Sequence, residues 1–238
     1  MDQPQRPFTI VEFVFPLMTQ LDFTAPHQVF SRLTGTQVRV ASATGGTVTS
    51  GEGLAFADTE SLADIDTCDL LFIPGGFGVA AVMEEAETMA HIRRLAAGAR
   101  YVTSVCTGSL ILAAAGLLTG RRAACHWAWR DKLALFGAIP DPARVVRDGD
   151  IITGGGVTAG LDFAFTVAAE VVGQDAAEAL LLMLEYAPAP PFPGGRPELA
   201  RDEVRARVEE IYDRLLAPRF EALERIVANG VRGTLLPL

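Results

Sequence analysis

Cysteine is scarce in this 238-residue chain, and the three that occur, Cys68, Cys106 and Cys125, are far apart in the sequence. Their number is odd and no pair has the spacing of zinc ligands, so the sequence predicts neither a disulfide framework nor a structural zinc site. We expect reduced thiols. Cys68 precedes a predicted strand and Cys125 ends one, so we interpret both as structural.

Basic side chains are also few: 20 Lys and Arg stand against 29 Asp and Glu, for a net charge of −9. This balance disfavours a phosphate-neutralising surface, so we expect no nucleic-acid partner. The richest apolar run, residues 110–118, is shorter than the roughly 20 residues that span a bilayer. The first residues also lack the pattern of a secretion signal. We therefore expect a soluble, cytoplasmic protein with no membrane partner.

Half of the residues are hydrophobic, enough for a large core. Short apolar runs bounded by glycine, proline or polar residues predict buried strands at residues 8–15, 37–43, 69–73 and 101–105. Helical patterns separate several of these runs, which predicts an α/β fold with a doubly wound, mostly parallel sheet and helices on both faces. Further strands are predicted at residues 121–125, 143–148 and 150–156. Two largely buried helices are predicted at 157–173 and 176–186.

A break follows at residues 186–198, which hold five prolines and two glycines. We predict an α/β domain at 1–192, then a linker and helical extension at 193–238. Apolar residues of the extension recur in helical steps at Val204, Val208, Ile211 and Leu215. We expect this stripe to pack on the chain's own domain or on a second subunit. A DNA-reading helix pair is the alternative, which the acidic composition disfavours.

Cys106 falls where the strand at 101–105 meets a helix that begins near Gly108. Ligands of doubly wound sheets collect at the carboxyl ends of the strands. A helix N-terminus there is expected to lower the pKa of the thiol and favour the nucleophilic thiolate. The turn resembles a nucleophile elbow, in which the N–H of Thr107 would stabilise developing negative charge. The alternative is that Cys106 is only a small buried hydrophobe.

A second glycine-rich loop follows the strand at 69–73 and carries Gly75 and Gly76. Backbone N–H groups approach ligands closely at glycine, so we expect these residues to form an anion-binding pocket facing Cys106. The spacing GGFG does not match a dinucleotide-binding fingerprint. We therefore predict no dinucleotide cofactor at this loop.

Acid or base chemistry at this edge requires a further group. Asp22 lies between the first strand and a helix, where it is either an acid/base residue or a helix N-cap.

His126 follows a later strand and precedes Trp127. It either activates the thiol, as in Cys–His pairs, or forms part of the binding wall with Trp127. Other candidate apolar walls are Phe23, Phe77 and Phe192.

The segments FPLMTQLDFTAPHQVF, YVTSVCTGS, CHWAW and EYAPAPPF resemble the ThiJ/PfpI superfamily, and within it the bacterial isonitrile hydratases. The resemblance covers residues 8–192. It implies a fold like that of class I glutamine amidotransferases, which is flavodoxin-like. It also implies addition of water to an isonitrile, giving an N-substituted formamide without metal or organic cofactor. The same resemblance implies that Cys106 is the nucleophile and Asp22 the acid/base. It also places Thr107 in the site, beside the nucleophile. Members are typically homodimers.

Other functions in the superfamily remain alternatives. Glutamine or peptide hydrolysis is disfavoured because Thr107, not a histidine, follows the elbow cysteine. Similar domains occur in AraC-type regulators, but the residues after Pro197 are too few for two helix-turn-helix units. A thiol-based redox sensor, which needs an exposed cysteine of low pKa, is the main alternative from another class.

Overall fold

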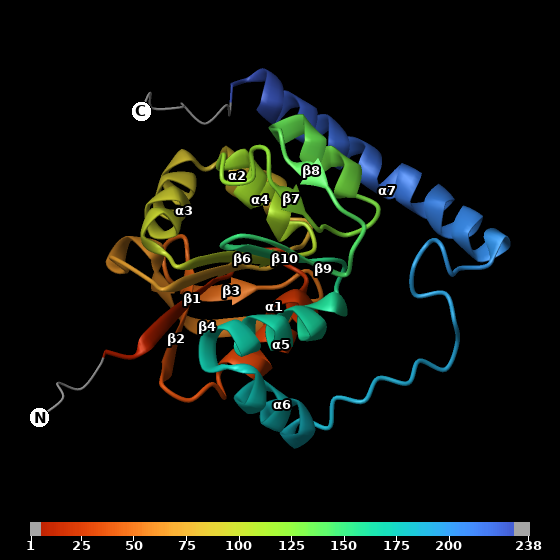
Figure 1. Cartoon of the computed structure of the whole chain (residues 1–238). Coiled ribbons are helices and arrows are strands. Elements are labelled where there is room, and N and C mark those ends of the chain that lie inside the picture. The colour runs from red at the N-terminus through yellow and green to blue at the C-terminus, as the bar shows by residue number, and fades with distance from the viewer. Residues whose placement is uncertain (1–5, 231–238) are drawn as a thin grey trace, which may run out of the picture.

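The predicted apolar runs form the centre of an eight-stranded sheet in the computed structural model, which describes residues 6–230 (Figure 1). The strand order is β3-β4-β2-β1-β5-β6-β10-β9. The strands of this sheet are β1 Phe8–Phe13, β2 Thr36–Ser42, β3 Gly46–Thr49, β4 Ala55–Ser61, β5 Leu70–Ile73, β6 Tyr101–Val105, β9 Val145–Asp148 and β10 Ile151–Gly154. All neighbouring pairs are parallel except β3 with β4 and β9 with β10, at the two edges. The mostly parallel sheet is therefore confirmed.

Two strands of the sheet, β3 and β4, have no counterpart in the sequence prediction. Their residues are mainly exposed or half-buried, so they lack the continuous apolar run that marks the central strands. The predicted strand at 121–125 lies outside the eight-stranded sheet. Only β7, Arg122–Ala123, is extended there, and it pairs with β8, Ile139–Pro140, in a separate two-stranded sheet.

Helices cover both faces of the sheet, as predicted (Figure 1). Side chains of α1, α5 and α6 join the core on one face, and those of α2, α3, α4 and α7, together with Phe23 of α1, join the core on the other. The helices are α1 Gln20–Phe30, α2 Val79–Glu84, α3 Ala86–Gly98, α4 Gly108–Ala114, α5 Ala159–Val172, α6 Gln174–Met183 and α7 Asp202–Ala228, with 3₁₀ segments η1 Leu62–Asp64 and η2 Arg130–Phe136.

Helix α6 differs from its predicted burial. Only Ala177 and Leu180 are buried, whereas Leu182 and Met183 at its end are largely exposed. The sequence pattern is apolar on all sides, and only the side that faces α5 finds a partner. The expectation of a largely buried helix is therefore wrong here.

The C-terminal extension packs on the chain's own domain. Leu216, Leu223 and Ile226 of α7 are buried in the core shared with α2. Ile211 and Leu215 of the predicted stripe do not enter this core and remain exposed. Packing of the stripe on a second subunit stays a prediction. The homodimer stays a prediction, as does the division of the chain at residue 192. Within residues 6–230, no helix has the length and apolar character needed to cross a lipid bilayer.

Candidate active site

The predicted elbow is formed by Cys106, which has a φ of +55° between β6 and α4. Such a conformation is costly for a residue other than glycine and persists only where the surroundings hold it. The Cys106 N–H donates to the carbonyls of Gly154 (3.0 Å) and Gly155 (2.9 Å). A Cβ on Gly108 would lie only 2.3 Å from the Ile73 carbonyl oxygen, so α4 approaches β5 closely because residue 108 is glycine. These contacts fix the thiol at the carboxyl end of β6.

Asp22 lies at the same sheet edge, in the first turn of α1, and its side chain is fully buried. Within residues 6–230, neither carboxylate oxygen has a hydrogen-bond partner. A Cβ added to Gly75 would lie 2.8 Å from Oδ2 of Asp22, 2.8 Å from Cβ of Cys106 and 2.5 Å from the N of Thr107. Gly75 therefore fills the narrow space between the carboxylate and the thiol. The N-cap interpretation of Asp22 is wrong, because α1 begins at Gln20 and Thr19 holds the cap position.

Thr107 joins the elbow to the glycine loop. Its Oγ1 accepts a hydrogen bond from the Gly76 N–H (2.8 Å) and donates to the Gly76 carbonyl (3.1 Å). The Gly76 N–H is therefore not free for an anion, which corrects that part of the sequence expectation. The nearby Gly75 N–H lowers the pKa of Asp22, and the nearby Thr107 N–H lowers the pKa of Cys106. These two backbone groups are the candidate donors in the site.

Burial controls the electrostatics of the pair. It raises the pKa of Asp22 to about 7, against smaller opposing effects of the Cys106 thiol and the Gly75 N–H. Burial and the neighbouring Asp22 charge raise the pKa of Cys106 well above its ordinary value. This direction is opposite to the effect expected of the helix dipole, because desolvation in a fully buried site outweighs the end of a seven-residue helix. The resting group is a thiol beside a carboxyl that exchanges protons near neutral pH.

His126 and Trp127 form one wall near the elbow, with ring centroids 5.8 Å apart. Burial lowers the pKa of His126 to about 4, so the ring is neutral at pH 7. Its Nδ1 accepts a 3.3 Å hydrogen bond from the Ala128 N–H, and no bond joins it to Cys106 or Asp22 within residues 6–230. The geometry therefore favours a wall over a base that activates the thiol.

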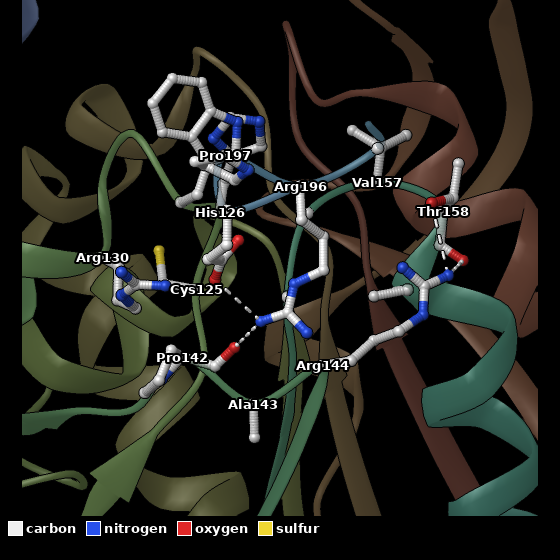
Figure 2. Close-up of a pocket in the computed structure, with 16 residues that line it drawn as sticks. Cys125, His126, Arg130, Pro142, Ala143, Arg144, Val157, Thr158, Arg196 and Pro197 are labelled. Carbon is white, nitrogen blue, oxygen red and sulfur yellow. Dashed lines mark hydrogen bonds and ion pairs between the residues drawn. The ribbon is translucent and has the colours of Figure 1, made fainter. Parts of the chain in front are cut away.

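A cavity of about 200 Å³ extends from this wall (Figure 2). Of the predicted site residues, only His126 and Trp127 line it, because Asp22, Cys106, Thr107 and the glycine loop lie deeper. Among the predicted apolar walls, Trp127 alone lines the cavity. Phe23 is packed in the core against Phe56, Phe77 lies under the guanidinium of Arg219 (4.1 Å), and Phe192 is largely exposed.

Comparison with known proteins identifies a family domain that contains almost the whole sheet and the candidate site. The model of the DJ-1/PfpI family matches residues 9–170, more than half of the chain. The chain belongs to this family. The predicted ThiJ/PfpI resemblance is therefore confirmed, together with the flavodoxin-like fold of class I glutamine amidotransferases.

Several relatives in the family cover most of the chain. The isonitrile hydratase of Pseudomonas putida is 48% identical over 216 residues, which are 91% of this chain and 95% of that protein. The crystal structure of a ThiJ/PfpI family protein from Pseudomonas syringae has a TM-score of 0.87 at 43% identity, covering 93% of this chain and 90% of that one. The HTH-type transcriptional regulator GlxA of Rhizobium meliloti is 31% identical over 68% of this chain and only 51% of its own length.

One residue near the site of this DJ-1/PfpI domain escaped the sequence analysis. Tyr212 of α7 packs its ring against His126 (5.8 Å) and Trp127 (5.4 Å). Burial and the proximity of Cys106 raise its pKa. Tyr212 lies beyond the family match, which ends at residue 170, in a segment predicted only as an extension. A local pattern offers no signal for a contact across more than 80 residues of chain, so only the folded structure reveals it.

Proposed function

We propose that the protein is an isonitrile hydratase, converting R–N≡C and water into R–NH–CHO. The observation that carries this proposal is the 48% identity with the Pseudomonas putida enzyme over nearly the full length of both chains. The buried pair of Asp22 and Cys106 around Gly75 supports it, because hydration requires one group that moves protons and one that attacks carbon. The substrate is a small-molecule isonitrile.

The first half of the proposed reaction adds the thiol to the terminal carbon. Asp22 accepts the proton of Cys106 as the sulfur attacks, and then delivers it to the same carbon. The product is a thioimidate, R–N=CH–S, on the enzyme. A carboxyl with a pKa of about 7 suits both transfers at neutral pH. This sequence needs no preformed thiolate, in agreement with the raised pKa of Cys106.

The second half releases the product. Asp22 takes a proton from water as the water oxygen attacks the thioimidate carbon, and delivers that proton to the nitrogen. Collapse of the tetrahedral intermediate breaks the C–S bond, gives the formamide and returns a proton to Cys106. The N–H groups of Gly75 and Thr107 stabilise charge at the reacting atoms. His126, Trp127 and Tyr212 contact the R group as walls.

Redox sensing is less well supported than hydration. Sensor cysteines are accessible and have a low pKa, whereas Cys106 is 4% exposed and its pKa is raised. Peroxide at a concentration that oxidises an accessible model thiol should leave Cys106 reduced in intact-mass spectra. Rapid oxidation, with no turnover of any isonitrile, would favour the sensor.

The proposal is tested by formamide production from cyclohexyl isocyanide, measured by mass spectrometry. Wild type should produce N-cyclohexylformamide, and Cys106→Ala and Asp22→Asn should each lower the rate by at least about 100-fold. Cys68→Ala, which removes a buried cysteine before the start of β5, at the opposite end of that strand from the Gly75 loop, is the matched control and should retain activity. A folded wild type that makes no formamide would reject the hydratase. Full activity in Cys106→Ala would reject the covalent route alone.

A further inference from the structure

The cavity beside the site has an unexpected charge. Its lining contains three arginines, Arg130, Arg144 and Arg196, but one carboxylate, Glu198. The whole chain carries a net charge of −9, so this local excess of guanidinium groups does not follow from composition. In Figure 2, Arg196 extends across the middle of the cavity, with Arg130 near Cys125 on one side and Arg144 near Thr158 on the other. Such a cavity favours a negatively charged occupant.

The cavity and the elbow share a wall. Gly155 lines the cavity, and its carbonyl accepts the 2.9 Å hydrogen bond from the Cys106 N–H. His126 and Trp127 also line the cavity. An occupant of the cavity therefore lies next to the backbone that holds Cys106.

The three arginines differ in the partners that they already have. Arg144 donates to Asp162 (2.7 Å) and to the Thr158 carbonyl (2.9 Å), which ties it to α5. Arg196 donates to the Pro142 carbonyl (2.7 Å) and to Glu198 (3.3 Å). Arg130 has neither a hydrogen bond nor an ion pair in the part of the chain that the structure describes.

This distribution indicates a single negative charge on the occupant. Each of Arg144 and Arg196 already has a carboxylate partner, which leaves the charge of Arg130 uncompensated. The N-terminus of α5 adds a partial positive charge, since Thr158 and Ala159 also line the cavity. Arginine binds the planar carboxylate through two parallel hydrogen bonds. A phosphate dianion would fit less well beside Glu198.

We propose that this cavity binds a carboxylate on the substrate, so that the preferred substrates are isonitriles that carry a carboxylate a few bonds from the nitrogen. The proposal rests on the proposed hydratase function and specifies its substrate class. Hydration changes only the isonitrile end, so the carboxylate contacts persist unchanged from substrate to product. Uniform binding of this kind lowers KM and leaves kcat little affected.

The test compares isocyanoacetate with its uncharged methyl ester, in wild type, Arg130→Gln and Arg196→Gln. We expect wild type to favour the carboxylate in kcat/KM. In each variant, the KM for isocyanoacetate divided by the KM for its ester should rise by about tenfold, the value of one hydrogen bond to a charged group. Arg207→Gln, an exposed arginine of α7 outside the cavity, is the matched control and should leave the ratio unchanged. Titration calorimetry with N-formylglycine, the hydration product, measures binding without turnover. Its affinity should be lower for each cavity variant than for wild type and unchanged for Arg207→Gln.

The outcomes separate this proposal from the hydratase function. Turnover of both isonitriles with equal KM, unaffected by either variant, would overturn the carboxylate site and leave the hydratase intact. Failure to hydrate any isonitrile would reject the hydratase. In that case, binding of N-formylglycine that weakens in Arg130→Gln would still support the carboxylate site, and absence of such binding would reject it as well.

Discussion

Replacing Asp22 with asparagine should make the stability of this protein less dependent on pH. Burial raises the pKa of Asp22 from 3.8 to about 7. Between these values the native state holds a proton that the unfolded state has released, so stability falls as pH rises. The fall is about 1.4 kcal/mol per pH unit, or about 4 kcal/mol in total, and is complete above pH 7. The ionised Asp22 carboxylate that the reaction needs therefore lowers the free energy of unfolding.

The assay is urea denaturation of wild type and Asp22→Asn from pH 5 to pH 8. Glu12 is buried with a raised pKa in both proteins, so the comparison isolates Asp22. The free energy of unfolding of the variant, relative to wild type, should grow by about 3 kcal/mol across this interval. A difference that stays constant with pH would refute the reasoning, whatever the variant's absolute stability. Asp58→Asn, at an exposed carboxyl, should show no such growth.

Two further substitutions test the packing, one beside the site and one in the buried face of α7. Gly75→Ala would place a Cβ 2.5 Å from the N of Thr107, so formamide production should fall by about 100-fold while the protein stays folded; unchanged activity would contradict the narrow space. Leu223→Ala, in the buried face of α7, should lower the free energy of unfolding by about 2–5 kcal/mol, measured in urea. The exposed Leu182→Ala is its control, and equal effects would show that α7 is not part of the core.

The central sheet was predictable because its signal is local. Each of β1, β5 and β6 is a mainly apolar run that is largely buried on both faces, and such runs mark parallel strands without knowledge of their neighbours. Strands β3 and β4 were not predictable, because edge strands are half exposed and their pairing depends on a long-range partner. The face of α7 that enters the core was not predictable for the same reason, since several faces of that helix carry apolar residues.

The order of strands and loops along the chain predicts which residues meet at the carboxyl edge of the sheet. Cys106 and the Gly75 loop each follow a parallel strand, and Asp22 lies in the first turn of α1, the helix that follows β1. The topology therefore brings all three together. The chemistry of these residues depends on the folded chain around them. The pKa of Asp22 and the protonation of Cys106 depend on desolvation, and the positions of Tyr212 and Arg130 depend on how distant segments fold back. Burial and long-range packing are properties of the whole fold, and no local pattern of residues encodes them.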